Sequence, residues 1–392
     1  MILKCAGFDE VVDAGARYHG PSRRAEPTLQ IAHNGIADSP DDLVILDDAV
    51  LTPHAGIAWR GFWIADAVQY MGPNRDWTTA NWLPGRYDAA THTIDIDARH
   101  LEPQLRIEEP LFYVDTTIGS SNFGHFVFDT LPYGLLFQRV RRSVPAIRPI
   151  VLPFSYQNQE ELFEVVFDFA YQDVVRHLHY MPILVEQLAV PRRQTDMEPM
   201  PWRFSFAGLR HVRDAAVRRW AHLPPAAAQA RPAGWRDLVR SSRLSPARRR
   251  EIRKREMASG AKVYLHRVQD VDALSRAGNL QGRNFTNIAA LTPLLSAKGY
   301  AVHDPATTAL DDLVAILSRA EVVVAIHGAG LANSAFAPPG TQIYEITGPD
   351  SAWRCFEGLS AVLGHDFTEL CQSRQADPQH PSLDIERLAT VL

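Results

Sequence analysis

Hydrophobic residues in the first 120 positions fall in short runs that Pro, Gly, Asp and Asn separate. Some runs alternate with polar residues and others are continuous, and both patterns are typical of β-strands. The clearest of them are residues 43–46, 57–64, 93–96 and 111–114. Helical spacing extends from residue 123 to 140, and a strand at 150–152 and a helix at 160–170 follow. The first half is therefore predicted to be α/β with a strand-rich beginning.

After Gly260 the pattern becomes a regular alternation of strands and helices. We expect strands at 262–266, 300–303, 321–326 and 342–346, and helices at 288–298, at 310–320 and from Gly330. Strands that alternate with helices of about ten residues form βα units around a parallel sheet. The run of three valines at 322–324 suits a strand that helices cover on both faces. This half predicts a Rossmann-like domain, whose ligand binds at the carboxyl ends of the strands.

The two halves are separated by residues 221–260, which are rich in Pro, Ala and Arg and poor in large apolar side chains. Such a composition is typical of a linker. The chain has 392 residues, which is more than the ~250–300 that one core usually spans. We therefore predict an N-terminal α/β domain at 1–220, a basic linker at 221–260 and a C-terminal Rossmann-like domain at 261–392. An alternative for the last helix is that it packs back on the N-terminal domain.

The charge distribution argues against a nucleic-acid partner. Forty Lys and Arg stand against 45 Asp and Glu, for a net charge of −5. Residues 231–255 alone hold nine Arg and one Lys against one Asp and one Glu, a local charge of +8, which leaves −13 for the rest. This segment is either a solvated linker that ends in a surface helix or a patch that contacts an anionic membrane or substrate.

Cysteine usage and the absence of long apolar stretches bear on the compartment. Cys5, Cys355 and Cys371 show no spacing of a disulfide framework or a zinc site. Lys4 and Asp9 interrupt the N-terminal residues, which are unlike a signal peptide. No run approaches the ~20 apolar residues needed to span a bilayer. We expect a cytoplasmic protein, with peripheral contact at the inner face of the membrane through residues 231–255 left open.

The segment most informative about chemistry is residues 321–346, where a buried strand runs directly into the motif His-Gly-Ala-Gly at 327–330 and then into a helix. Glycines let a backbone approach a ligand closely, and the N–H groups and dipole at a helix start favour a phosphate. Asn333 and Ser334 would add donors in the first turn. The alternative is a tight turn without a ligand.

Two arginines are predicted to lie at the same sheet edge. Arg267 follows the strand at 262–266, and Arg283 precedes the helix at 288–298. Guanidinium forks match the oxygens of a diphosphate, although surface ion pairing is the alternative for each arginine. Glu345, near the end of the strand at 342–346, is placed to accept from a ribose hydroxyl. Its alternative is a buried pair with one of the arginines.

A third cluster lies in the first half, where Asn122, His125 and Asp129 are spaced i, i+3 and i+7 on one helical face. A His and an Asp on one face supply a general base for a hydroxyl nucleophile. The alternative is a polar network that anchors the helix start, with Asn122 as the N-cap.

Two further patterns resemble known motifs. Asp95 and Asp97 match the DxD that holds a divalent metal, but they lie in an alternating run that places both acids on one strand face. The spacing of Gly328, Gly330 and Asn333 is near a dinucleotide fingerprint, but that fingerprint opens a first βα unit and this motif follows at least two strands. NAD binding is therefore not expected.

Taken in order, the motifs resemble glycosyltransferase family 61. They are Asn-Phe-Gly-His-Phe-x-x-Asp-x-Leu-Pro at 122–132, Tyr-Leu-His-Arg at 264–267, Arg-x-x-x-Asn at 283–287, and His-Gly-Ala-Gly-Leu-x-Asn at 327–333. The resemblance covers roughly residues 110–350 of the chain. The family includes capsular polysaccharide biosynthesis proteins, plant xylosyltransferases and animal O-linked N-acetylglucosaminyltransferases. It departs from the family pattern at His266, commonly Ser, and at Ile288, often Glu.

The resemblance implies a GT-B fold, in which two Rossmann-like domains face a central cleft, and an inverting, metal-independent transfer without a cofactor. The donor would be a nucleoside diphosphate sugar, expected to be a UDP-sugar, and the acceptor a hydroxyl of a glycan or lipid-linked glycan in polysaccharide biosynthesis. The expected base is Asp129 or His125, with Asn122 on the acceptor side. The expected donor-binding residues are Arg267, Arg283, His327, Gly328, Ala329, Gly330, Asn333 and Glu345.

Two alternatives to this function stay open. One is a non-catalytic protein that binds glycans or supports assembly on the same scaffold. The other is a metal-dependent transferase that uses Asp95 and Asp97.

Overall fold

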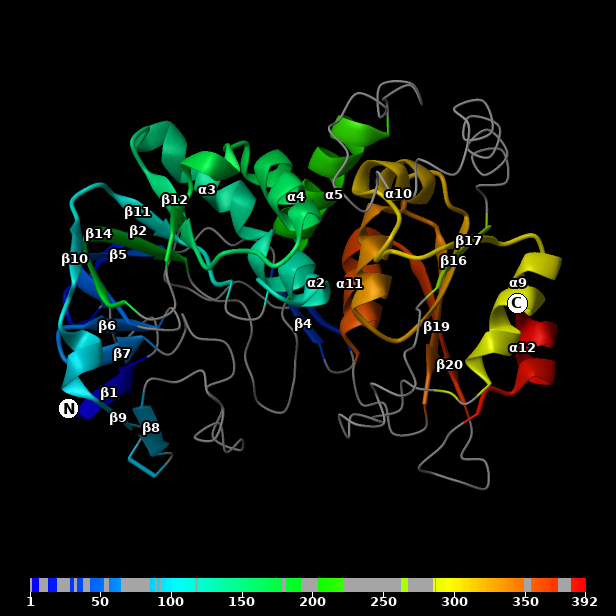
Figure 1. Ribbon diagram of the computed structural model, residues 1–392, viewed down its shortest axis with the longest axis horizontal. Coiled ribbons are helices and arrows are strands. Elements are labelled where there is room, and N and C mark those ends of the chain that lie inside the picture. The colour runs from blue at the N-terminus through cyan, green and yellow to red at the C-terminus, as the bar shows by residue number, and fades with distance from the viewer. Residues whose placement is uncertain are drawn as a thin grey trace. The chain divides into compact units, whose positions relative to one another are not determined.

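The computed structural model of the chain forms two compact α/β units, Met1–Val212 and Arg213–Leu392 (Figure 1). The division falls within α5 (Phe206–Trp220). The described residues are 2–6, 13–19, 29–31, 34–37, 43–52, 56–64, 85–88, 90–91, 93–116, 119–177, 181–191, 204–221, 262–266, 285, 287–348, 354–372 and 382–392. Apart from residue 221, the predicted linker at 221–260 therefore lies outside the described residues.

The first unit is built on a large mixed sheet. The strand order along its main path is β13 (Val175–Arg176), β12 (Arg148–Val151), β11 (Leu111–Tyr113), β14 (Ile183–Pro191), β5 (Leu43–Leu51), β6 (Ile57–Trp59), β7 (Phe62–Ile64), β1 (Ile2–Ala6), β9 (Thr93–Ile96) and β8 (Gly85–Asp88). In addition, β10 (Leu105–Ile107) pairs with β14, and β2 (Arg17–His19) pairs with β5. A separate small sheet joins β15 (Phe204–Ser205), β4 (Asn34–Ala37) and β3 (Leu29–Ile31). The stretch from β13 to β14 is parallel and is the Rossmann-like part of this unit.

The predicted strand at 57–64 is two strands joined by a tight turn. Arg60 and Gly61 both have positive φ, 45° and 83°, as the two central residues of a type I′ hairpin require. The hydrophobic pattern did not reveal the turn, because the strands on either side of Arg60 and Gly61 have only three residues each and together resemble one apolar segment. β6 and β7 therefore form a hairpin, with Trp59 opposite Phe62.

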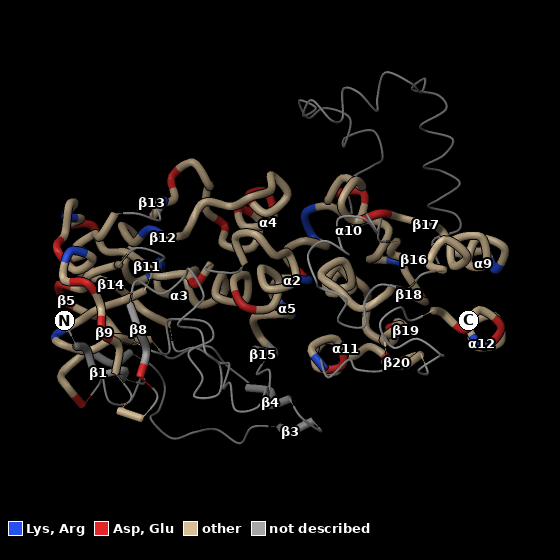
Figure 2. The backbone as a smooth tube through the Cα atoms, turned by 60° about the horizontal axis from the view of Figure 1, so that its bottom comes forward, with Lys and Arg blue, Asp and Glu red and all other residues tan. Residues whose placement is uncertain are grey.

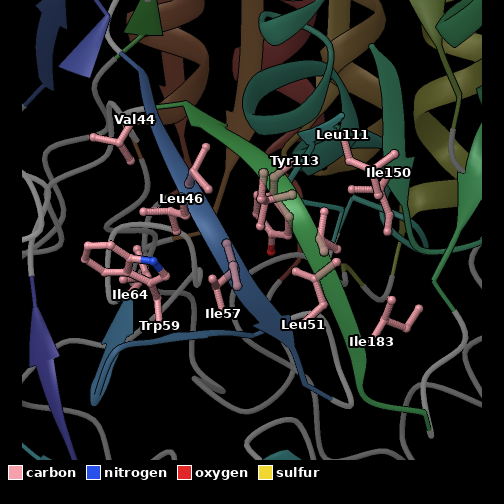
Figure 3. Packing of buried hydrophobic residues seen from close by; sticks show 14 of the residues in the cluster. Val44, Leu46, Leu51, Ile57, Trp59, Ile64, Leu111, Tyr113, Ile150 and Ile183 are labelled. Atoms are coloured by element: carbon pink, nitrogen blue, oxygen red, sulfur yellow. The ribbon is translucent and has the colours of Figure 1, made fainter. Parts of the chain in front are cut away.

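Branched aliphatic side chains of neighbouring strands, together with Trp59 and Tyr113, form a core of the first unit (Figure 3). β5 contributes Val44, Leu46 and Leu51, and the buried positions of β11 and β12 pack against them. Each fully buried Val, Leu or Ile contributes about 1.5–3 kcal/mol. This core fixes β11 and β12, whose carboxyl ends lead into the helices that carry the candidate site.

Helices connect the parallel strands of the first unit: α2 (Phe123–His125), the π-helix η5 (Phe126–Thr130), α3 (Tyr133–Ser143), α4 (Gln157–Phe167) and the 3₁₀ turn η6 (Tyr171–Asp173). The single helix predicted at 123–140 is thus interrupted. Leu131 N–H donates to Phe126 O at 2.9 Å, one residue further back than in an α-helix, and Pro132 then has no N–H to continue the pattern. Hydrophobic spacing does not separate these geometries, because the buried side chains stay on nearly the same face.

The second unit is a parallel five-stranded sheet, as the sequence predicts, with one strand more than expected. Its order is β17 (Ala301–His303), β16 (Lys262–Leu265), β18 (Val322–Ile326), β19 (Gln342–Thr347) and β20 (Asp366–Cys371). α9 (Leu291–Ala297) and α12 (Ile385–Val391) cover one face, and α10 (Leu310–Leu317) and α11 (Cys355–Leu363) cover the other (Figure 1). Leu388 of α12 belongs to the core of this unit. The last helix therefore packs on the sheet of its own unit.

Each unit has a topological switch point, which is a strand whose two neighbours in the sheet are reached by separate connections that start on opposite sides of it. In the second unit β16 has β17 on one side and β18 on the other. In the first unit β11 has β12 on one side and β14 on the other. Ligands of such sheets bind outside the carboxyl ends of the strands at this point. The two switch points are therefore the places to look for a site.

Acidic and basic positions are interspersed along the described backbone (Figure 2). The basic run at 231–255 lies outside the described residues. Among the residues described, no helix is long and apolar enough to span a membrane.

Candidate functional site

The carboxyl end of β18 carries a buried histidine and carboxylate pair. His327 directly follows the strand, and its Nδ1 is hydrogen-bonded to Oε1 of Glu345 on β19. The two residues are only 3% and 1% exposed, and the edge of the His327 ring packs against Phe356 of α11. The parallel register places Glu345 beside Ala325, two residues before His327, so the two side chains lie on the same face.

Burial decides the electrostatics of this pair. It raises the pKa of the Glu345 carboxyl, and the hydrogen bond and charge of His327 act in the opposite direction. Because Nδ1 of His327 is bound to Glu345, Nε2 is the ring nitrogen left for a ligand. The predicted role of Glu345 toward a ribose stays a prediction. Among the described residues its buried partner is His327, and Arg267 and Arg283 lie outside the described residues.

The backbone after His327 makes a turn that glycine alone accommodates easily. Gly328 has φ 155° and ψ 175°, a region essentially restricted to glycine. The helix predicted from Gly330 is a 3₁₀ helix, η9 (Ala329–Phe336), in which Leu331 N–H donates to Gly328 O. The N–H groups of Ala329 and Gly330 have no acceptor within that helix. These two groups lie just beyond the strand end, where an anion would be bound.

Three other residues of η9, Gly330, Asn333 and Ser334, differ in the contacts that they make within the fold. Asn333 is 2% exposed and donates Nδ2 to Gly330 O at 2.8 Å, so one of its donors holds the turn. Ser334 Oγ is buried and has no hydrogen-bond partner among the described residues. A Cβ at Gly330 would meet Pro305 at 3.5 Å, which is an ordinary contact. The fold therefore does not itself require glycine at position 330.

At the neighbouring strand end, His266 follows β16. Its N–H donates to His303 O at 2.7 Å, and its Nδ1 lies 3.3 Å from the Tyr264 hydroxyl. Burial raises the pKa of Tyr264 to about 12. This hydroxyl therefore keeps its proton at neutral pH and is able to donate to His266.

In the first unit, the loop after β11 anchors a second histidine and carboxylate pair. Asn122 is the N-cap of α2, and its side chain accepts from the N–H groups of Gly124 at 2.9 Å and His125 at 3.4 Å. His125 Nδ1 lies 2.8 Å from Asp129 Oδ2, and Asp129 belongs to the π-helix that begins directly after His125. The side chains are 17% and 6% exposed, respectively. The two predicted roles of this segment are therefore compatible: Asn122 anchors the start of the helix, and His125 and Asp129 form the pair that would act as the base.

Close packing holds that loop against the helix start. A Cβ at Gly119 would lie 2.4 Å from Thr130 Oγ1, so a side chain there would displace the helix. Gln159 of α4 donates to Gly119 O at 2.6 Å, and Thr130 Oγ1 donates to Asp115 O at 2.9 Å. The His125 and Asp129 pair therefore stands on a fixed backbone. π-turns inside helices are frequent at functional sites.

The comparison with protein families bears on both pairs. The model of Glycosyltransferase 61 matches residues 123–344, which is more than half of the chain. The chain belongs to this family. The match begins directly after Asn122, includes His125, Asp129 and His327, and ends one residue before Glu345. No curated protein matches the chain.

Membership in family 61 makes the protein a glycosyltransferase, with a sugar donor and a glycan acceptor. The structure also accounts for Ile288, at which the sequence departs from the expected pattern: its side chain packs against the core of the second unit. The neighbouring Asn287 exchanges two hydrogen bonds with the backbone of Leu383. In this glycosyltransferase, residue 287 therefore ties the C-terminal segment to the sheet.

The carboxylates of the DxD pattern are both exposed in the structure. Asp97 accepts from Arg99 through both oxygens and caps the 3₁₀ turn η4 (Ala98–Leu101), and Arg99 holds the pKa of Asp97 well below its usual range. Within the described part of the chain, no group of three or more His, Cys, Asp or Glu is arranged to hold a metal ion. A metal held by Asp95 and Asp97 would therefore have to displace Arg99.

Sequence reasoning missed Thr347, Arg354 and Glu369 at the carboxyl edge of the second sheet. Glu369 of β20 accepts from Thr347 Oγ1 at 2.8 Å and from Arg354 Nη1. The signal would have been a strand at 366–371, but polar residues at 366, 368 and 369 break both the alternation and any continuous apolar run. Only the pairing of β20 with β19 brings Glu369 next to Glu345.

Replacing Asn122 with Ala should destabilise the first unit by about 1 kcal/mol, because two N–H groups of the helix start lose their acceptor. Transfer activity should fall as well, since the cap positions His125. Thermal denaturation and steady-state kinetics measure the two effects. Asn122→Asp keeps an acceptor and should retain most of the stability. Equal melting temperatures for the Ala variant and the wild type would contradict the assigned cap.

Proposed function

We propose that this family 61 glycosyltransferase moves a sugar from a nucleoside diphosphate donor to a hydroxyl of a glycan or lipid-linked glycan, with inversion and without a metal. The observation that carries the proposal is the buried His327–Glu345 pair at the switch point of a parallel sheet, followed by the glycine turn at Gly328. Buried charged groups at the strand ends of such a sheet are expected where an anionic ligand binds.

The donor diphosphate would be bound by several positive or N–H groups. His327 Nε2 and the N–H groups of Ala329 and Gly330 supply part of them. Arg267 and Arg283, which lie outside the described residues, are proposed to supply the rest through bidentate contacts. Without a metal, these groups have to stabilise the charge that grows on the diphosphate as the sugar leaves.

The His125–Asp129 pair is proposed to activate the acceptor. Asp129 accepts from Nδ1 of His125 and orients the ring, and Nε2 then takes the proton of the acceptor hydroxyl. The hydroxyl oxygen forms a bond to the anomeric carbon while the bond from that carbon to the diphosphate breaks. A single displacement of this kind inverts the configuration. Asn122 fixes the start of the helix on the acceptor side.

The finer features follow from the same proposal. The two units take the GT-B arrangement, with a UDP-sugar bound by the second and the acceptor by the first. The protein acts in the cytoplasm in polysaccharide biosynthesis, and residues 231–255, with their local charge of +8, contact an anionic membrane at its inner face.

The direct test is release of the nucleoside diphosphate from a panel of nucleotide sugars, UDP-sugars among them, by the purified full chain, with and without EDTA. We expect turnover with one donor at a rate that EDTA does not change. Turnover that EDTA abolishes and Mn²⁺ restores would favour the metal-dependent alternative with Asp95 and Asp97. No turnover with any nucleotide sugar would favour a binding protein and contradict the proposal.

A further inference from the structure

The carboxyl edge of the second sheet carries another charged pair beside His327 and Glu345. Glu369 on β20 lies opposite Glu345 on β19 in the parallel register, and residues in register point to the same face of a sheet. Arg354, directly before α11, donates Nη1 to Glu369 Oε2. Thr347 Oγ1 donates to Glu369 Oε1 at 2.8 Å. Both oxygens of Glu369 are thereby fixed, so its carboxylate has a defined place next to that of Glu345.

Four ionisable side chains follow the order His327, Glu345, Glu369 and Arg354, so the two carboxylates lie between the histidine and the arginine. Adjacent carboxylates on neighbouring strands repel each other, and a cation on either side offsets the repulsion. Glu345 is 1% exposed, whereas the side chains of Glu369 and Arg354 are 19% and 38% exposed. The outer pair therefore borders solvent and the inner pair does not.

The outer pair acts on the inner pair through its charges. These three residues face Glu345 from neighbouring elements: His327 after β18, Glu369 on β20 and Arg354 before α11. The charge of Glu369 raises the pKa of Glu345, and the charge of Arg354 lowers it. Glu369 lies directly beside Glu345 in the register, whereas Arg354 binds the far side of the pair through Glu369. The nearer charge is therefore negative, which favours retention of a proton on the inner pair.

We propose that Arg354 and Glu369 are positioning residues of the donor site: the fixed carboxylate of Glu369 keeps a proton on the His327–Glu345 pair, so that His327 Nε2–H faces the anionic leaving group as a charged donor. Arg354 holds Glu369 in place, and its positive charge offsets part of the influence of Glu369 on that proton. The inference rests on the proposed function, because it takes a diphosphate as the ligand of His327. Neither residue touches the donor in this account.

Replacing Glu369 and replacing Arg354 should shift the pH at which His327 loses its proton in opposite directions. Glu369→Gln removes a negative charge, so His327 should lose its proton at lower pH than in the wild type. Arg354→Gln removes a positive charge, so the loss should move to higher pH. Each shift should be about one pH unit, as expected of a charge near a partly buried group. In the double variant the two shifts should largely cancel.

The experiment is an NMR titration of the His327 ring in the full chain, with labelled histidine and without donor. His327→Gln assigns the signal by its disappearance. The matched controls are Glu386→Gln and Arg319→Gln, which replace exposed residues of the same unit and should not shift the titration. Melting temperatures show that each variant is folded. Unchanged titration in both test variants, or shifts of the same sign, would overturn the inference.

A second readout separates this inference from the proposed function. The dissociation constant of UDP is measured against pH for the wild type and both single variants. We expect binding to weaken above the pH at which His327 loses its proton, with the same opposite shifts. Opposite shifts in the NMR titration without UDP binding at any pH would contradict the proposed function alone. UDP binding with identical pH profiles in all variants would overturn the positioning pair alone.

Discussion

Replacement of Asp129 with Asn should lower kcat for sugar transfer by about 10²–10⁴-fold, the usual contribution of a positioned general base. The amide cannot take the negative charge that orients and stabilises a protonated His125, although it keeps nearly the same shape. The KM for the donor should change little, because the residue belongs to the unit that binds the acceptor in the proposal. Steady-state kinetics with the donor identified by the nucleoside diphosphate release assay measure both constants.

Asp168→Asn is the matched control for this variant. Asp168 is an exposed residue of the same unit that ends α4 in the left-handed conformation, which Asn tolerates. The control should keep wild-type activity. Activity within a few-fold of the wild type in Asp129→Asn, His125→Ala and the double variant would remove this pair from the mechanism.

Replacement of His327 with Gln should reduce kcat/KM for the donor by about 10–100-fold, the value of one hydrogen bond to a charged group. Gln retains an amide able to donate to Glu345 but provides no charge toward the diphosphate. Some stability should be lost too, because the buried Glu345 loses the imidazole ring to which it is hydrogen-bonded. Kinetics at varied donor concentration and thermal denaturation separate the two effects.

His365→Gln is the control for a buried histidine of the same unit. His365 is 7% exposed and precedes β20, at the opposite edge of the sheet from His327. It should lose some stability and leave the donor constants unchanged. If both variants lost activity only in proportion to their stability, His327 would be structural and not part of the donor site.

The architecture of the second unit was predictable because its strands are apolar and its helices have regular length. The parallel arrangement of β16 to β19 and the position of His327 at a strand end follow from that alternation, whereas the order of the strands in the sheet does not. The partner of Glu345 did not follow, because spacing along the chain places it at the correct edge but does not give the register. Only the pairing of Ala325 with Glu345 sets that carboxylate beside His327.

Local backbone geometry was the other part that patterns could not supply. The π-turn at 126–130 shifts one hydrogen bond by a residue, and the 3₁₀ helix after Gly328 replaces an expected α-helix. Both preserve the hydrophobic face that the sequence displays, so the apolar spacing is the same in either geometry. Asn122 was predictable as a cap because Asn at that position has a well-defined chemical role.

The central claim, a metal-independent site for a nucleoside diphosphate in the second unit, is tested most directly by calorimetric titration of the full chain with UDP, GDP and dTDP in EDTA. The account predicts that one of them, expected to be UDP, binds one to one with micromolar affinity, and that His327→Gln weakens this binding at least about 10-fold. Binding by none of the three, or equal binding by the wild type and His327→Gln, would contradict it.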